Sequence, residues 1–198
     1  LDLDPSRIAV ALVRVLGQIG VKTGPLQERA EVLRNLASDD TIHDAVERKP
    51  WFCAGCPHNS STRLPEGARA YAGIGCHYMA QWMDRETSGH THMGGEGANW
   101  IGEALFSKRE HVFQNMGDGT YNHSGNQAIR AAVYAGTNIT FKILYNDAVA
   151  MTGGQQHEGP LTPYQIGAEL LAFGVEKVVA VVDEKERMPR LPSGIEVR

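Results

Sequence analysis

The chain lacks the features that mark membrane insertion, export or nucleic-acid binding. None of its apolar runs approaches the roughly 20 residues that a helix needs to cross a bilayer. The amino end has no basic segment followed by an apolar stretch, as a signal peptide has. The net charge of −4 gives no support for a basic surface that binds nucleic acid. We therefore expect neither a membrane nor a nucleic acid among the partners of this protein.

Cysteine is also scarce, with 3 residues in a chain of 198. An odd number of cysteines does not form a closed set of disulfides and, with no export signal, it favours the reducing cytoplasm. Hydrophobic residues make up 42% of the chain and charged residues 21%, as in an ordinary globular protein. The sequence opens at Leu1 without an initiator Met and stops at Arg198. We expect both ends to be cut, so that the remaining domains of the same polypeptide are partners of this chain.

Residues 1–49 form a predicted helical segment, which is a linker or the end of a preceding domain. Asp4-Pro5 is typical of a helix start, because a capping carboxylate precedes a proline in the first turn. Apolar residues then recur on one helical face, and a second helix is predicted over about 25–37. A second domain is predicted over 50–198, truncated at its carboxyl end.

Within this second domain, short apolar runs alternate with glycine turns. The pattern predicts strands over 111–116, 139–145 and 178–182, and helices over 126–134 and 162–173. Strands that alternate with helices indicate an α/β fold, with a mostly parallel sheet flanked by helices.

The tripeptide Gly117-Asp118-Gly119 directly follows the first of these strands. Ligands of open α/β sheets bind beyond the carboxyl ends of the strands, and glycines there allow a close backbone approach. An acidic residue between the glycines repels a phosphate unless a divalent cation bridges the two, and Mg²⁺ favours carboxylates together with phosphate oxygens. The tripeptide therefore predicts a metal-bridged phosphate site.

A second metal ligand is expected from the end of the neighbouring strand. Asn146 occupies that position, with a gap of 26 residues between Gly119 and Asn146, and the Ala148 carbonyl is well placed to add a third oxygen. The alternative is an ordinary tight turn, which Asp-Gly often forms and which the tripeptide alone favours. The metal site becomes the favoured interpretation because Asn146 follows the next strand and is itself followed by Met151-Thr152-Gly-Gly-Gln.

Two longer segments carry a family resemblance. Residues 117–125 read Gly-Asp-Gly-Thr-Tyr-Asn-His-Ser-Gly, and residues 146–155 read Asn-Asp-Ala-Val-Ala-Met-Thr-Gly-Gly-Gln. This pattern resembles the diphosphate-and-metal motif of thiamine-diphosphate enzymes. Over about 50–183 it is most similar to the 2-oxoacid:ferredoxin oxidoreductases, and among these to the fused, single-chain bacterial indolepyruvate ferredoxin oxidoreductases.

The resemblance implies a thiamine-diphosphate-binding fold and a set of site residues. Asp118, Asn146 and the Ala148 carbonyl are expected to hold Mg²⁺, while other residues line the diphosphate and the rest of the cofactor. These other expected cofactor-binding residues are Gly75, Cys76, His77, Gly94, Gly95, Gly117, Gly119, Thr120, His123, Ser124, Met151 and Thr152.

Cys53 and Cys56 form a Cys-x-x-Cys pair, and Cys76 follows in a Gly-Ile-Gly-Cys turn. Thiolates at this spacing suit zinc, with His58 or His77 as a further ligand, or an iron–sulfur cluster. Three unrelated buried thiols are a further alternative. The family resemblance favours a 4Fe–4S cluster whose fourth cysteine lies outside this chain.

Each of two polar loops has two possible interpretations. Residues 90–97 read His-Thr-His-Met-Gly-Gly-Glu-Gly, which fits either a wall of the cofactor pocket or a surface loop. His157 and Glu158 follow the second motif and could face the substrate, although a solvated turn is the favoured interpretation.

The implied activity is the oxidative decarboxylation of a 2-oxoacid, with indolepyruvate or another arylpyruvate as substrate and coenzyme A as co-substrate. Ferredoxin is the implied electron acceptor, and the full enzyme is expected to be a homodimer. Because the residues that activate the cofactor are expected in other domains, the fragment alone is predicted to be inactive. The alternatives are a pyruvate- or 2-oxoglutarate-type enzyme of the same family, a non-redox thiamine-diphosphate lyase, and a zinc-stabilised binding module.

Overall fold

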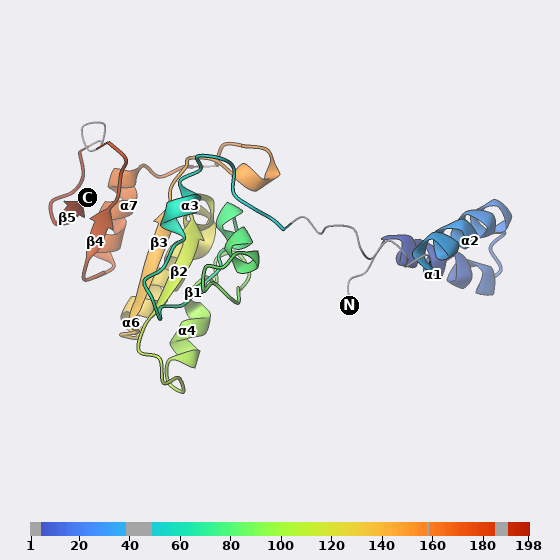
Figure 1. Ribbon diagram of the computed structural model, residues 1–198, viewed down its shortest axis with the longest axis horizontal. Helices are drawn as coiled ribbons and strands as arrows, with labels where there is room; N and C mark the ends of the chain where they lie inside the picture. The colour runs from blue at the N-terminus through green and yellow to red at the C-terminus, as the bar shows by residue number, and fades with distance from the viewer. Residues whose placement is uncertain (1–4, 39–48, 158, 185–189) are drawn as a thin grey trace. The chain divides into compact units, whose positions relative to one another are not determined.

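The computed structural model describes residues 5–38, 49–157, 159–184 and 190–198. The chain divides into two compact units, Leu1–Arg48 and Lys49–Arg198, and each is described separately here (Figure 1). Among the described residues, no helix is both long and apolar enough to cross a membrane.

The first unit is a pair of helices, α1 (Pro5–Gln18) and α2 (Gly24–Ser38), which pack against each other. The predicted helical segment is confirmed. α1 buries none of its residues, and Leu12 on its apolar face is 55% exposed. The two helices therefore bury little apolar surface within this unit.

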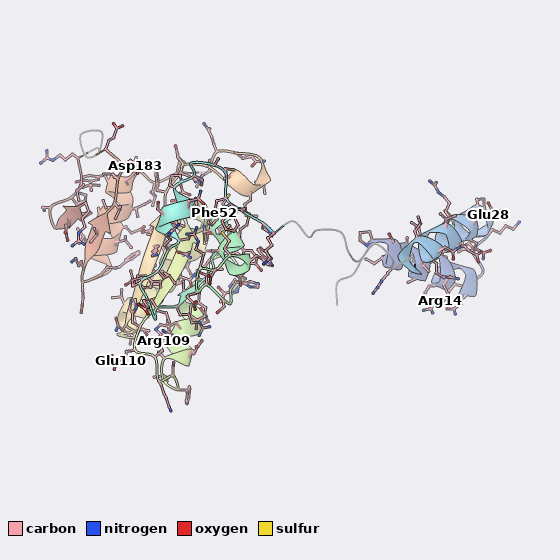
Figure 2. All side chains as sticks on the ribbon, in the orientation of Figure 1. Arg14, Glu28, Phe52, Arg109, Glu110 and Asp183 are labelled. Atoms are coloured by element: carbon pink, nitrogen blue, oxygen red, sulfur yellow. The ribbon has the colours of Figure 1, made fainter. Side chains whose placement is uncertain are left out.

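The second unit is built on three parallel strands in the order β1 (Ala70–Tyr71), β2 (Val112–Gly117) and β3 (Ile139–Leu144). β2 and β3 pair along their whole lengths, so Gly117 lies beside Leu144 and both strands end at the same edge. Figure 2 shows Arg109 and Glu110, which precede β2, toward the opposite end of the sheet from Phe52. The carboxyl ends of the strands therefore mark one edge of the unit.

The predicted α/β fold with a parallel sheet is confirmed, with one correction. The strand expected over 178–182 is shorter, β4 (Val178–Ala180), and it pairs only with β5 (Ile195–Val197) in a separate parallel sheet. A cavity of about 810 Å³ lies between the edges of β3 and β4, lined by apolar side chains such as Ile143 and Val178. β4 and β5 therefore form a sheet apart from β1, β2 and β3.

Alternate side chains of β2 face the helices. Met116 packs in an apolar cluster with Ile129 of α6 (Asn126–Tyr134) and with Ile166 and Leu170 of α7 (Pro163–Ala172). Val112 packs with Trp100 of α4 (Ala98–Glu103) and with Tyr71. Phe52 belongs to a third buried cluster, with Ala80 and Met83. The remaining short helical segments are α3 (His58–Ser61), η2 (Cys76–Trp82), α5 (Asp118–Thr120), η3 (Tyr121–Gly125) and η4 (Ala150–Thr152).

The helix predicted over 126–134 is confirmed as α6, which has these bounds. Helical structure that the sequence did not predict precedes it and begins at Asp118, directly at the end of β2. The intervening segment, η3, is a π-helix, a form that is rare and often found at functional sites. Asp118 therefore lies in the first helical turn, where the chain leaves the sheet.

Candidate functional site

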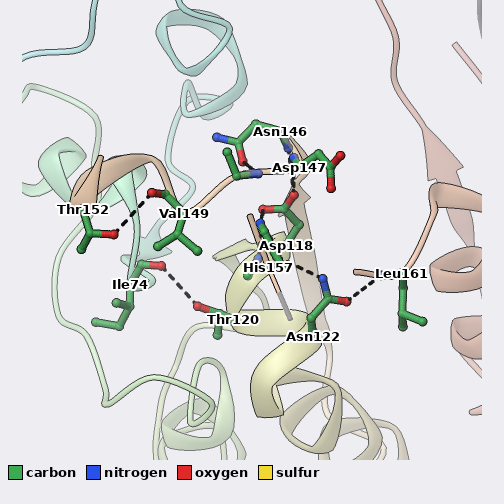
Figure 3. Close-up of polar contacts among 12 residues, drawn as sticks. Ile74, Asp118, Thr120, Asn122, Asn146, Asp147, Val149, Thr152, His157 and Leu161 are labelled. Atoms are coloured by element: carbon green, nitrogen blue, oxygen red, sulfur yellow. Dashed lines mark hydrogen bonds and ion pairs between the residues drawn. The ribbon is translucent and has the colours of Figure 1, made fainter. Parts of the chain in front are cut away.

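The best-organised polar cluster lies at the carboxyl edge of the sheet, and its centre is the side chain of Asp118 (Figure 3). Asp118 is 2% exposed. Its Oδ1 accepts a hydrogen bond from the Gly119 N–H at 2.9 Å. Its Oδ2 accepts from the N–H groups of Asn146 at 3.0 Å and Asp147 at 2.7 Å. These three donors fix the carboxylate in one orientation and offset the cost of burying it.

The turn after β3 brings two further candidate oxygen ligands beside Asp118. The Asn146 amide can be oriented with its nitrogen inward, donating to the Ala148 carbonyl at 2.9 Å and to Asp118 Oδ1 at 3.2 Å. With its oxygen inward, Asn146 accepts from the Ala148 N–H at 3.3 Å, and three oxygen atoms then converge. Without a cation the inward nitrogen pairs with both oxygens, whereas a bound cation favours the inward oxygen, because carboxylate, amide and carbonyl oxygens are ligands of Mg²⁺. The donor set therefore fits Mg²⁺.

Backbone geometry supports this turn. Asp147 has a φ of +54°, a left-handed conformation that Asp and Asn tolerate better than most residues. In this conformation the successive N–H groups of Asn146 and Asp147 both donate to Asp118 Oδ2. The sequence Asn-Asp after β3 thus contributes both a candidate ligand and the turn that presents it.

The loop after β1 lies against the same edge. Thr120 Oγ1 donates to the Ile74 carbonyl at 3.3 Å. A Cβ on Gly73 would collide with the Asn115 carbonyl, so this close approach requires glycine. His77 is 1% exposed, and its ring lies next to Gly75 and Gly117. The structure therefore brings together the predicted positions 75–77 and 117–120.

His77 is buried as a neutral side chain. Burial, and to a smaller extent the neighbouring His58, lower the pKa of His77 to about 3. The two rings stack with their centroids 6.0 Å apart. His77 Nε2 has no hydrogen-bond partner among the residues that the structure describes. A neutral imidazole with a spare nitrogen can accept or donate one hydrogen bond to a bound group.

The glycine-rich loop forms a wall against the helix that follows β2. A Cβ on Gly94 would overlap the Ser124 hydroxyl, so the loop backbone lies directly on this residue. Ser124 Oγ is 2.6 Å from His123 Nδ1. Gly95 is buried beneath the ring of His92. These contacts place the loop beside the predicted positions 123 and 124.

Glu96 is a buried polar residue to which the sequence analysis gave no role. It is 0% exposed and accepts hydrogen bonds from the Gly94 N–H at 2.6 Å and the Ile74 N–H at 3.2 Å. The carboxylate therefore joins the loop after β1 to the glycine-rich loop. A single acid within a run of glycines was the only signal in the sequence.

Asn122 and His157 form a second unpredicted pair. The side chain of His157 is 3% exposed and lies between Asp118 and Asn122, so its interpretation as a solvated turn is wrong. Asn122 lies four residues after Asp118, and this spacing within a helix could have indicated that the two share a face. Glu158, named with His157 in the sequence analysis, lies outside the described residues.

The second motif contributes less to the cluster. Thr152 Oγ1 donates to Gln155 Oε1 at 2.7 Å, and the Val149 N–H donates to the Gln155 carbonyl at 2.8 Å. Met151 is 58% exposed. These contacts close a small loop through η4, and the cofactor-binding roles of Met151 and Thr152 stay predictions.

The three cysteines are neighbours but do not form an assembled metal site. Cys76 has a raised pKa, first because it is buried and then because Cys56 and Cys53 are near. Cys56 Sγ lies 3.2 Å from His58 Nδ1, whereas Cys53 is exposed. Among the described residues, no three His, Cys, Asp or Glu side chains are grouped closely enough to hold a metal ion. The iron–sulfur cluster therefore stays a prediction.

The Cys-x-x-Cys turn itself is well ordered by hydrogen bonds. The Cys56 N–H donates to the Cys53 carbonyl at 3.1 Å. Asn59 Nδ2 donates to the carbonyls of Cys53 at 3.0 Å and Cys56 at 3.2 Å. Hydrogen bonds thus hold the backbone of this turn, but its thiol groups do not meet at one point.

Comparison with known proteins identifies the second unit. A family model described as thiamine pyrophosphate enzyme, C-terminal TPP binding domain, matches residues 73–190, more than half of the chain. The matched range contains Asp118, Asn146 and Ala148.

Individual relatives are more distant. The indolepyruvate oxidoreductase subunit IorA of Thermococcus kodakarensis is 29% identical over 179 residues, which cover 75% of this chain and 28% of the relative. The IorA subunit of Pyrococcus abyssi is 30% identical over 161 residues, which cover 69% of this chain and 25% of the relative. The chain thus spans about a quarter of the length of these curated relatives.

A solved structure has a similar fold. The 2-oxoglutarate:ferredoxin oxidoreductase of Magnetococcus marinus, solved with 2-oxoglutarate, coenzyme A and succinyl-CoA bound, aligns with a TM-score of 0.51 and 22% identity. The alignment covers 69% of this chain and 55% of that chain.

Proposed function

The chain belongs to the thiamine pyrophosphate enzymes as a C-terminal TPP-binding domain, and from this we propose that it binds Mg²⁺ and thiamine diphosphate within a 2-oxoacid:ferredoxin oxidoreductase. The observation that carries the proposal is the buried Asp118 carboxylate, which lies beside the Asn146 amide and the Ala148 carbonyl at the edge of the sheet. A buried carboxylate held by three N–H donors is suited to a cation that bridges it to a diphosphate.

Each part of this edge has a distinct task in the proposal. Asp118, Asn146 and Ala148 hold Mg²⁺, and the backbone at 119–120 lies beside the diphosphate. The loops at 75–77 and 94–95 enclose the rest of the cofactor, and Glu96 fixes these two loops to each other. When bound, thiamine diphosphate supplies the carbanion chemistry that decarboxylates a 2-oxoacid, while the protein supplies position and electrostatics.

The substrate and the electron pathway are also part of the proposal. The similarity to IorA subunits supports indolepyruvate or another arylpyruvate as the 2-oxoacid, which becomes an acyl-CoA. Electrons pass to ferredoxin through a 4Fe–4S cluster held by Cys53, Cys56, Cys76 and a fourth ligand outside this chain. The enzyme works as a homodimer together with further domains of the same polypeptide, and this chain alone is inactive.

The binding of the cofactor is tested by titrating the chain with thiamine diphosphate in the presence of Mg²⁺, by calorimetry and under anaerobic conditions. We expect saturable binding that needs Mg²⁺ and that Asp118→Ala abolishes. Binding that Asp118→Ala leaves unchanged contradicts the assigned metal site.

The substrate is tested separately, with the longer polypeptide that contains this chain. Reduction of ferredoxin is measured with indolepyruvate, pyruvate and 2-oxoglutarate, each with coenzyme A. Indolepyruvate is expected to give the highest kcat/KM. A preference for pyruvate or 2-oxoglutarate supports another member of the same family, and product formation without ferredoxin reduction supports a non-redox lyase.

A further inference from the structure

A buried hydrogen-bond donor beside Asp118 lacks an acceptor. The side chain of His157 is 3% exposed, and its Nε2 has no hydrogen-bond partner among the described parts of the chain. Nε2 lies 3.8 Å from Asp118 Oδ1, which is too long for a hydrogen bond. Buried polar atoms are nearly always paired in folded proteins, so a specific exception needs a physical explanation.

Asn122 determines which nitrogen of His157 carries the proton. The Asn122 side chain accepts from the Leu161 N–H at 3.4 Å through Oδ1, so its Nδ2 faces His157 Nδ1 at 3.2 Å (Figure 3). The reverse orientation of the amide places two donors, its nitrogen and the Leu161 N–H, against each other. His157 Nδ1 is therefore the acceptor, and in the neutral ring Nε2 carries the hydrogen.

The ring also lies where a ligand of the metal is expected. Its Cε1 is 3.2 Å from the position that a Cβ on Gly119 would occupy, so the ring rests on the Asp118-Gly119 turn. An oxygen that binds the cation beside Asp118 Oδ1 comes within reach of Nε2. Because Nε2 carries a hydrogen, it can donate to such an oxygen but cannot bind the metal itself.

We propose that His157 binds the diphosphate, donating its Nε2–H to an oxygen of the metal-bound phosphate, and that Asn122 is a positioning residue which holds the ring in this tautomer. The proposal rests on the proposed function and extends it to a segment that follows the second motif. Through Asn122, both His157 and Leu161 are connected to the helix that begins at Asp118.

The test compares variants by calorimetric titration with Mg²⁺ alone and with thiamine diphosphate in the presence of Mg²⁺. Asp118→Ala reports on the metal site and His157→Ala on the proposed donor. His157→Gln restores an N–H donor of similar reach. His111→Ala is the matched control, because His111 lies just before β2 at the far end of the sheet, where its Nε2 pairs with Thr140 Oγ1 at 2.8 Å. Circular dichroism checks that each variant is folded.

We expect His157→Ala to weaken the binding of thiamine diphosphate by about ten- to a hundredfold, as for a lost hydrogen bond to a charged group. The affinity for Mg²⁺ alone stays unchanged, His157→Gln recovers part of the loss, and His111→Ala binds like the wild type. Thiamine, which has no phosphate, is expected to bind His157→Ala and the wild type equally.

The positioning role of Asn122 is tested by the nitrogen chemical shifts of His157 in Asn122→Ala. A purely structural role of Asn122 would leave the tautomer of His157 unchanged. In the wild type, the nitrogen chemical shifts of the neutral His157 ring are expected to report the Nε2–H tautomer, and the Nε2–H signal is expected to shift when the diphosphate binds. In Asn122→Ala the two tautomers are expected to mix, and the affinity for thiamine diphosphate falls without any change in the affinity for Mg²⁺.

Three outcomes overturn the inference and leave the proposed function intact. His157→Ala could bind thiamine diphosphate as tightly as the wild type while Asp118→Ala has lost binding. It could lose affinity for Mg²⁺ alone, which makes His157 a metal ligand. His157→Ala could bind thiamine diphosphate more tightly than the wild type, which means that the ring of His157 blocks the binding site. A folded wild type that binds no thiamine diphosphate overturns both proposals.

Discussion

The site around Asp118 and the group of three cysteines differ in how far the polypeptide alone organises them. Asp118 is held by three backbone donors, and the candidate ligands Asn146 and Ala148 already surround it. The thiols of Cys53 and Cys76, in contrast, belong to no assembled metal group in the described parts of the chain. One site is formed before any ligand binds, and the other is not.

The chemistry of the ligands explains this difference. Carboxylate oxygens accept hydrogen bonds from nearby N–H groups, so a turn of the backbone can hold them in place without a metal. Thiolates are weak acceptors and repel one another, and the raised pKa of Cys76 near Cys56 and Cys53 shows both burial and this repulsion. We infer that the first site binds its ligand with little rearrangement, whereas thiol ligands assemble only as the metal binds.

The largest expected effect is that of Asp118→Ala on the binding of thiamine diphosphate with Mg²⁺. Loss of a metal ligand is expected to weaken binding by more than about a hundredfold, since even residues behind the ligands contribute ten- to a hundredfold. Cys53→Ser, at an exposed cysteine with no assigned contact to the cofactor, is expected to change the affinity by less than about tenfold in the same calorimetric titration. Similar losses in the two variants contradict the independence of the two sites.

The converse experiment measures iron and sulfide after anaerobic reconstitution of the longer polypeptide. Replacing Cys53, Cys56 and Cys76 together by Ser is expected to remove the bound cluster, because serine oxygen is a poor ligand for iron–sulfur centres. Asp118→Ala is the control and is expected to retain the cluster. Zinc in place of iron in the wild type supports the alternative of a zinc site.

The helical run that begins at Asp118 also helps to hold the Asp118 site in place before a ligand binds. Tyr121 is 0% exposed and donates to Glu169 Oε2 of α7 at 2.6 Å. Tyr121→Phe removes this donor to the half-buried Glu169 carboxylate, so the free energy of unfolding is expected to fall by about 1–3 kcal/mol. Chemical denaturation measures this loss. Tyr134→Phe is the matched control, because Tyr134 is 95% exposed, and an equal loss in both variants rules out the role of the Glu169 bond.

The smallest expected effect is a change of stability with alkaline pH. Burial, together with the hydrogen bond that the phenol donates to Glu103, raises the pKa of Tyr71 to about 12. The folded state therefore retains this proton more tightly than the unfolded state, whose tyrosine pKa is about 10. The stabilisation is present below pH 10 and is lost as the pH rises through 12. Tyr71→Phe is expected to flatten this part of the stability profile, and an unchanged profile contradicts the shifted pKa.

Much of the fold was predictable because short patterns determine it locally. The helix over 126–134 has an apolar face that packs on β2, and the helix at 163–172 begins with Thr162 and Gln165 in a capping box. The helical run over 118–125, which precedes the first of these helices, was not predicted, because it has no apolar periodicity of its own. Its helical conformation depends instead on contacts such as that between Tyr121 and Glu169.

The sequence alone determined the residues that meet at the edge of the sheet. Parallel strands end together, so Gly-Asp-Gly after β2 and Asn-Asp-Ala after β3 predict neighbouring polar groups, and the structure brings Asp118, the Asn146 amide and the Ala148 carbonyl together. Only the tertiary structure decided the roles of Glu96 and His157, since each becomes buried through segments that are distant in sequence or irregular. No periodic pattern marks a side chain that loop packing buries, because its environment depends on long-range contacts rather than on its sequence neighbours.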